Sequence, residues 1–197
     1  MSASYVEHND FYNPNPNYLT IVALEDDCEV NLFSYEEFEY SIDGSDNWTT
    51  IEMGDVDISI NTGQYISFRG NWEEEPITSF TISKPCNLTG NCNSLLFGDD
   101  AANNLDLSGH ASCYYGLFSY CPIVEISPTF LPATTLAEHC YAYMFENCES
   151  LITAPQLPAT TLAEYCYNDM YLNCESLTFA PKLPATTLAE YCYQYMF

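Results

Sequence analysis

Basic side chains are almost missing from this sequence. Only Arg69, Lys84 and Lys182 carry a fixed positive charge among 197 residues, against 28 acidic residues, and the formal net charge is −25. This charge excludes nucleic acid as a partner, because binding to a phosphate backbone requires a positively charged surface. It also argues against anionic membrane surfaces. We expect a soluble surface that repels its own copies, or else a surface that attracts divalent cations or basic partners.

Long apolar runs are missing as well. No stretch reaches the roughly 20 apolar residues of a transmembrane helix, so membrane insertion is not expected. The opening residues, MSASYVEHNDFYNPNPNYLTI, lack the charged and apolar regions of a secretory signal peptide. We therefore expect synthesis in a cytoplasm. An extracellular location would then require a mature fragment with an added Met, or another exit route such as a virus particle.

Catalytic and metal-binding motifs are absent. The sequence contains no P-loop, G-x-G-x-x-G, G-x-S-x-G or H-E-x-x-H motif. His8, His110 and His139 have no evident cysteine or serine partner, and no cysteine pair has zinc-ligand spacing. The acidic stretch GDDAANNLD does not match the spacing of a calcium loop. We expect no catalytic residue, no metal site and no cofactor, and the protein is not expected to be an enzyme.

The first half of the sequence has a period of two. After a polar lead at residues 1–17, short β-branched and aromatic runs such as YLTIVAL, CEVNLF and VDISI alternate with turn clusters such as DGSDN and NTG. This pattern predicts an antiparallel, sandwich-like all-β module at residues 18–85. Residues 86–109 lose this alternation and are rich in the turn-forming residues Gly, Asn and Asp. We interpret them as the junction and cap of a second module.

The second half repeats itself. The motif LPATTLAE begins at Leu131, Leu157 and Leu183, a period of 26 residues, and a degenerate copy precedes it. Periods of this length are typical of leucine-rich repeats, in which each unit buries its apolar face against its neighbours. We therefore predict a leucine-rich-repeat solenoid at residues 110–197, with an incomplete last repeat.

Within each unit the pattern favours a helix. T-L-A-E has the form of a helix capping box, and an apolar stripe follows at positions i, i+4 and i+8. Positions that differ between units, 139, 142, 143 and 146, also have the spacing of one helix face. The capping pairs are Thr135 and Glu138, Thr161 and Glu164, and Thr187 and Glu190. The expected core residues are Leu136, Cys140, Met144, Cys148, Leu162, Cys166, Met170, Cys174, Leu188 and Cys192.

A short strand such as SLTFAP completes each unit. Pro181 ends this strand, because proline cannot donate a hydrogen bond to a sheet. The predicted fold class is therefore α+β: the sandwich-like module, followed by an α/β solenoid of one helix and one short strand per repeat.

Ten cysteines and 17 tyrosines are the unusual side chains. Seven cysteines follow the repeat in a C-x7-C spacing, so we expect them to be reduced core residues. Cys86 and Cys92 lie outside this spacing and are the candidates for a disulfide or a loop clip. Among the tyrosines, those at the varied positions are candidates for stacking on sugars or anchoring a protein partner, with gap filling between helices as the alternative. They are Tyr143, Tyr165, Tyr191 and Tyr195.

The repeat LPATTLAEYCYNDMYLNCESLTFAPKLPATTLA resembles the BspA-like leucine-rich repeats of gut bacteria, which occur in surface proteins and in proteins of the phages that infect those bacteria. The preceding YLTIVALEDD and YISFRGNW segments look like the β module that often leads into such repeats. The resemblance covers roughly residues 18–197. It implies a solenoid displayed outside cells for adhesion or recognition, and it offers no catalytic residues.

Two functions are consistent with these observations. The first is a non-enzymatic adhesion or recognition module that binds glycan or protein on a cell surface, carried on a phage virion or a bacterial surface. The alternative is a structural subunit of an extracellular filament or capsid decoration, which associates with itself or with other virion proteins through the open end of its solenoid. A longer array of repeats, or simple fraying, would also explain the incomplete last unit.

Overall fold

The computed structural model describes residues 14–71 and 79–197. Residues 1–13 of the predicted polar lead, which include His8, lie outside the described residues. The NWEEEP turn lies outside them from residue 72 onward.

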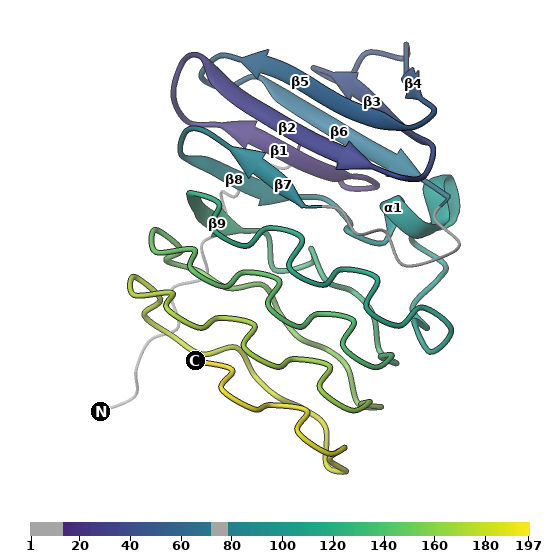
Figure 1. Ribbon diagram of the computed structural model, residues 1–197, viewed down its shortest axis with the longest axis vertical. Helices are drawn as coiled ribbons and strands as arrows, with labels where there is room; N and C mark the ends of the chain where they lie inside the picture. Colours follow the sequence, from purple (N-terminus) through teal and green to yellow (C-terminus); the bar gives the residue numbers. More distant parts are fainter. Residues whose placement is uncertain (1–13, 72–78) are drawn as a thin grey trace.

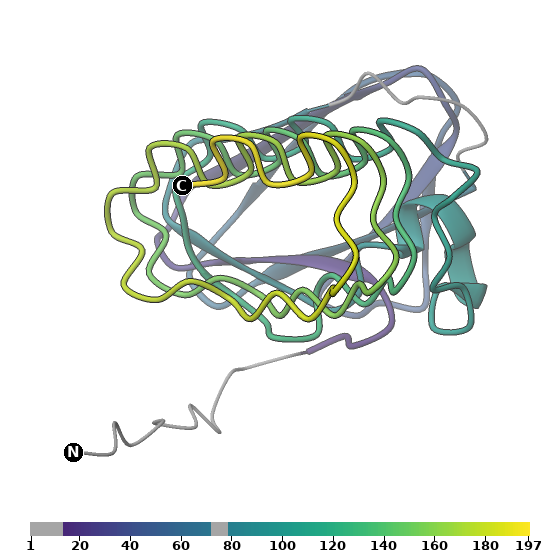
Figure 2. The ribbon, with the colours of Figure 1, turned by 90° about the horizontal axis from the view of Figure 1, so that it is seen from below.

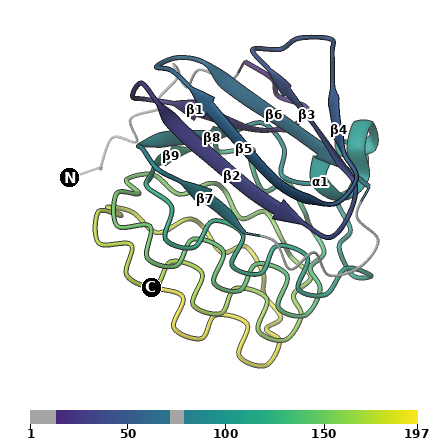
Figure 3. The ribbon, with the colours of Figure 1, turned by 45° about the horizontal axis from the view of Figure 1, so that its top comes forward.

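The period-two half of the sequence, together with residues 86–89 and 123–126, forms two facing sheets (Figures 1 and 3). One sheet has the order β4-β3-β6-β1-β8-β9 and the other has the order β5-β2-β7. The strands are β1 (Leu19–Ala23), β2 (Cys28–Ser34), β3 (Phe38–Ile42), β4 (Thr49–Ile51), β5 (Gly54–Ile60), β6 (Tyr65–Gly70), β7 (Phe80–Ile82), β8 (Cys86–Thr89) and β9 (Ile123–Ile126). Every pairing is antiparallel except the parallel pairing of β8 with β9.

The core of this part lies between the two sheets. Strand β2 alternates buried and more exposed residues along its length, as expected for a strand with one face against a core. Phe68 of β6 and Phe80 of β7 meet edge to face across the sheets, with ring centroids 5.1 Å apart.

Helix α1 (Ser94–Phe97) and the 3-10 turn η1 (Gly98–Asp100) connect the sheets to the second half. The buried Ser94 hydroxyl accepts a hydrogen bond from the Leu19 amide and donates one to the Phe68 carbonyl, each 2.8 Å long. Gly90, just before this connection, has a φ of +81°, and a Cβ there would lie 1.8 Å from the Tyr18 carbonyl oxygen. Only glycine fits at this close approach.

The second half is not a solenoid of helix-plus-strand repeats, so the predicted α+β class and leucine-rich-repeat solenoid are wrong. Within the described residues, the only helical elements are α1 and η1. The segments expected to be helices are runs of consecutive turns, which we call the turn chains: residues 111–120, 138–147, 164–173 and 190–195. Figure 2, seen from below, shows the coils that contain them overlying one another.

The backbone of the turn chains is incompatible with an α-helix. Every fourth residue has a positive φ, for example 55° at His139, 58° at Tyr143 and 57° at Asn147, whereas a helix requires negative φ throughout. Hydrogen bonds alternate in direction as well. The Met144 amide bonds back to the Tyr141 carbonyl within its own chain, whereas the Tyr141 amide bonds to the Cys166 carbonyl of the next coil.

The predicted helix caps therefore have no helix to cap. Thr135 forms isolated parallel bridges with Asp106 and with Thr161 of the next coil, and the Leu136 amide donates to the Thr161 carbonyl at 3.0 Å. The roles assigned to Glu138, Glu164, Thr187 and Glu190 fail for the same reason. The short strand predicted in each unit is present in the degenerate first unit as β9, whereas in the later units it is reduced to single contacts, such as the bridge between Glu125 and Thr153.

The coils extend both sheets of the first half. Strand β9 of the first coil pairs with β8, and on the other side the Phe80 amide of β7 donates to the Leu117 carbonyl at 2.8 Å. One row of stacked rings crosses this boundary and a second runs beside it within the coils, with neighbouring centroids 4.9 to 6.0 Å apart; all of these rings are buried except the half-buried Tyr193 and the exposed Phe197. One row is Phe80, Phe118, Phe145, Tyr171 and Phe197; the other is Tyr114, Tyr141, Tyr167 and Tyr193. One hydrophobic core thus includes residues of both halves.

Candidate functional site

The four tyrosines singled out in the sequence lie at or near the surface of the turn chains. Tyr143, Tyr165, Tyr191 and Tyr195 each have a positive φ, and none of them is buried. Tyr165 and Tyr191 stack directly on one another, and Tyr143 lies in a neighbouring group of rings. Tyr195 is 68% exposed.

The stacked rings form a column across three coils. His139 and Tyr165 are parallel within 9°, with centroids 4.8 Å apart, and Tyr165 and Tyr191 repeat this spacing at 15°. Tyr115 lies beside the column, 5.1 Å from Tyr143 and 6.5 Å from His139. We call this surface the aromatic face: Tyr115, His139, Tyr143, Tyr165 and Tyr191.

Two members of the aromatic face were not recognised in the sequence. His139 occupies the position where the later units have tyrosine, and the sequence showed no cysteine or serine partner for it. Tyr115 belongs to the degenerate first unit, where the later units have Ala142 and Asn168. His139 could have been recognised from the sequence, because it shares its repeat position with Tyr165. For Tyr115 no sequence signal existed, because its contact depends on how neighbouring coils stack.

A row of glutamates accompanies the column. Glu138, Glu164 and Glu190 each directly precede a ring of the column, and all three are exposed. A Glu138 carboxylate oxygen lies 3.8 Å from Nδ1 of His139. Partial burial raises the pKa of the Tyr165 hydroxyl, and Tyr191, Glu164 and Glu190 raise this pKa further by their charge. The face is therefore electronegative.

Further acidic groups lie at the other side of the aromatic face. Burial raises the pKa of Tyr115, and the charges of Glu146 and Asp169 add to this effect. The same two carboxylates contribute to the raised pKa of Tyr143, for which burial is again the largest cause. Within residues 14–71 and 79–197, no lysine or arginine forms an ion pair with these acids.

The residues expected in the core ladder have mostly buried side chains. Cys140, Cys166, Met144 and Met170 are fully buried, whereas Leu162 is half-buried and Leu188, in the last coil, is 64% exposed. The other expected members, Leu136, Cys148, Cys174 and Cys192, are buried.

All ten cysteines are buried free thiols, so Cys86 and Cys92 do not form the suggested disulfide. Burial raises the pKa of Cys166 to about 12 and that of Cys174 to about 11. Because the thiolate is the reactive form, these cysteines are poor nucleophiles at neutral pH.

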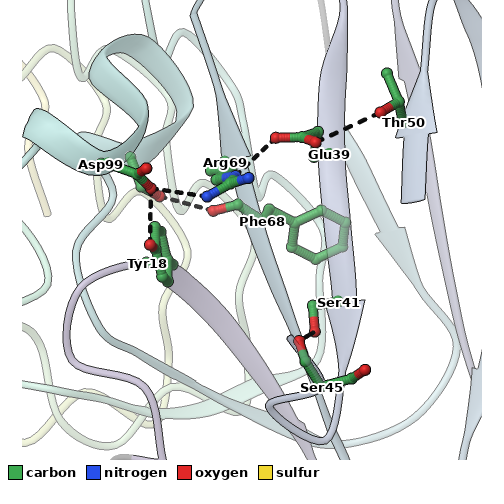
Figure 4. A network of polar contacts seen from close by, with 9 residues as sticks. Tyr18, Glu39, Ser41, Ser45, Thr50, Phe68, Arg69 and Asp99 are labelled. Carbon is green, nitrogen blue, oxygen red and sulfur yellow. Dashed lines mark hydrogen bonds and ion pairs between the residues drawn. The ribbon is translucent and has the colours of Figure 1, made fainter. Parts of the chain in front are cut away.

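A second polar cluster surrounds Arg69 of β6 (Figure 4). Its guanidinium donates to Glu39 at 2.7 Å and to Asp99 at 2.8 Å, and lies 4.2 Å from the centroid of the Trp48 ring. The Tyr18 hydroxyl also donates to Asp99 at 2.8 Å. A polar cleft of about 350 Å³ adjoins the cluster and includes Glu36 and Glu37 in its lining. Because its cation is already paired, we interpret this cluster as a structural link between β6 and η1.

The described residues include no group of three or more His, Cys, Asp or Glu side chains arranged to bind a metal ion. The same residues contain no helix with the length and apolar character that a membrane span requires. No family model, curated protein or solved structure matches this chain, so the expected links to cell-surface, phage and adhesin proteins have no support, and the aromatic face is defined by its geometry alone.

Proposed function

We propose that this protein is a non-enzymatic recognition module that binds a protein or glycan ligand through the aromatic face. The observation that carries the proposal is the column of His139, Tyr165 and Tyr191, whose rings repeat at 4.8 Å across three coils and remain accessible. Tyrosine combines an apolar ring with a polar tip and is enriched among the residues that dominate binding energy at interfaces.

The backbone gives a second reason to assign the column a role in binding. A left-handed conformation costs most residues other than glycine about 1–2 kcal/mol, and asparagine and aspartate tolerate it best. Asn147, Asp169 and Asn173 occupy equivalent left-handed positions elsewhere in the turn chains. Stacking between rings offsets part of the cost for Tyr165 and Tyr191, at about 0.5–1.5 kcal/mol per pair. Strain of this kind is often retained where a side chain serves function.

A binding role also fits what surrounds the face. The rings and carboxylates form a repeating surface and do not converge on one reacting atom, as catalytic groups must. Membership of the BspA-like family and an extracellular location are parts of this proposal.

The test removes the rings and keeps the backbone. The double variant Tyr165→Asn/Tyr191→Asn places a residue that tolerates positive φ at both positions. Wild type and variant are applied to an array of neutral glycans and an array of peptides of varied charge. We expect at least one ligand whose affinity falls by about tenfold or more in the variant, as for residues that dominate an interface.

A matched control removes two exposed tyrosines outside the aromatic face, Tyr35 and Tyr120. Tyr120 also has a positive φ, of 63°, so Tyr35→Asn/Tyr120→Asn tests the effect of the substitution type. This control should bind as wild type does. The proposal is wrong if both arrays show no ligand, or if every ligand binds the Tyr165/Tyr191 variant as tightly as the wild type.

A further inference from the structure

The stacking within the column limits how it can contact a ligand. Both faces of the Tyr165 ring are covered, one by His139 and the other by Tyr191. A sugar that stacks on an aromatic side chain needs a free ring face, and Tyr165 offers only its edge and its hydroxyl group. At the column centre a ligand therefore meets a ring edge and a hydroxyl group, so hydrogen bonding and charge contribute to its selection.

The charge on this surface has one sign. Glu138, Glu164 and Glu190 lie in three adjacent coils, joined by backbone hydrogen bonds from His139 to Glu164 and from Tyr165 to Glu190, each 3.1 Å long. Like charges on neighbouring strands destabilise each other. A ligand that brings positive charge relieves this repulsion, and an anionic ligand increases it.

We propose that the ligand of the aromatic face is a basic segment of a partner protein, whose arginine or lysine side chains pair with Glu138, Glu164 and Glu190 along the column. The inference rests on the proposed function and names its ligand class. Arginine suits this surface because its fork of donors matches a carboxylate while its stem packs against aromatic edges. The acidic chain also attracts such a partner from a distance.

The test uses a fluorescein-labelled peptide of six Gly-Arg repeats as the probe, and a peptide of six Gly-Gln repeats as its neutral counterpart. Binding to the full chain is followed by fluorescence anisotropy. We expect the arginine peptide to bind and the glutamine peptide not to bind. Affinity should fall as salt rises from about 50 to about 300 mM, because exposed charges are increasingly screened.

The decisive comparison holds the net charge constant. Glu138→Gln/Glu164→Gln/Glu190→Gln neutralises the row, and Glu25→Gln/Glu29→Gln/Glu52→Gln neutralises three exposed glutamates of the first half. We expect the first variant to bind the arginine peptide about tenfold or more weakly and the second to change by less than about twofold. Equal weakening by both variants would show that only the bulk charge attracts the peptide, and would overturn the inference.

The outcomes separate the inference from the proposed function. A neutral glycan that binds the wild type but not Tyr165→Asn/Tyr191→Asn, together with an arginine peptide that does not bind, overturns the basic partner and leaves the recognition module standing. Circular dichroism and the thermal unfolding midpoint confirm that each variant is folded. Should a variant unfold, the single substitution Glu164→Gln replaces the triple one and is compared with Glu52→Gln.

Discussion

At the scale of single residues, the turn chains depend on side chains that accept a positive φ. Asn147 and Asn173 occupy equivalent positions in successive coils, with φ values of 57° and 60°. The Asn173 amide group donates to the Asn147 side-chain oxygen at 2.9 Å, so the two side chains also link neighbouring coils. Because asparagine tolerates this conformation better than most residues, its recurrence at this repeat position is a signal of these turns in the sequence.

Replacing Asn173 tests this backbone requirement. Asn173→Ala should lower the free energy of unfolding by about 1–2 kcal/mol, because alanine disfavours the left-handed region. Asn173→Gly loses the same hydrogen bond but accepts the conformation, so it should cost less. Urea denaturation of both variants measures the difference, with Glu175→Ala as an exposed control nearby. Equal losses for alanine and glycine would contradict a left-handed residue at this position.

At the scale of elements, the connection between the sheets and the coils is held by polar contacts as well as by packing. Asp99 of η1 accepts hydrogen bonds from Tyr18 and from Arg69 of β6. The Tyr18 hydrogen bond and the Arg69 charge lower the pKa of the Asp99 carboxyl group, although partial desolvation acts in the opposite direction. The arginine was noticeable in the sequence as a rare cation, but its partners lie far from it along the chain.

This lowered pKa gives the link a defined pH dependence. A carboxyl group with a depressed folded pKa stabilises the fold above its unfolded pKa of about 3.9, and the contribution disappears as the pH falls through the folded value. Asp99→Asn should therefore unfold more easily than wild type at pH 7, and the two unfolding midpoints should converge below about pH 3. Thermal unfolding across this range is the measurement. A gap that stays constant down to the lowest pH would exclude a charged Asp99 as its cause.

At the scale of the whole molecule, the sheets and the coils share one core. Phe145 is fully buried in the second coil, between Phe118 at 6.0 Å and Tyr171 at 5.7 Å, in the row of rings that begins at Phe80 of β7. A continuous core predicts that the two halves unfold as one cooperative unit.

Tryptophan fluorescence tests this cooperativity, since Trp48 packs against Arg69 of β6 in the first half and the coils contain no tryptophan. Phe145→Ala leaves a cavity in the coils and should cost about 3–5 kcal/mol. If unfolding is cooperative, the tryptophan transition should move to lower denaturant concentration and should report the whole loss in the free energy of unfolding caused by Phe145→Ala. Leu188→Ala, which changes a largely exposed side chain, is the control. An unchanged tryptophan transition in Phe145→Ala would mean that the coils unfold separately.

The sequence by itself determined the period-two strands of the first half, the 26-residue repeat and the excess of negative charge, because these follow from local alternation, from spacing and from composition. It did not determine the backbone of the repeats. Apolar residues spaced by four, such as Cys140 and Met144, suit both a helix and a chain of turns. The choice between them depends on amides such as that of Tyr141, which bond to a carbonyl of the next coil. That acceptor exists only once the coils are stacked, and the same stacking brings His139, Tyr165 and Tyr191 together as a surface.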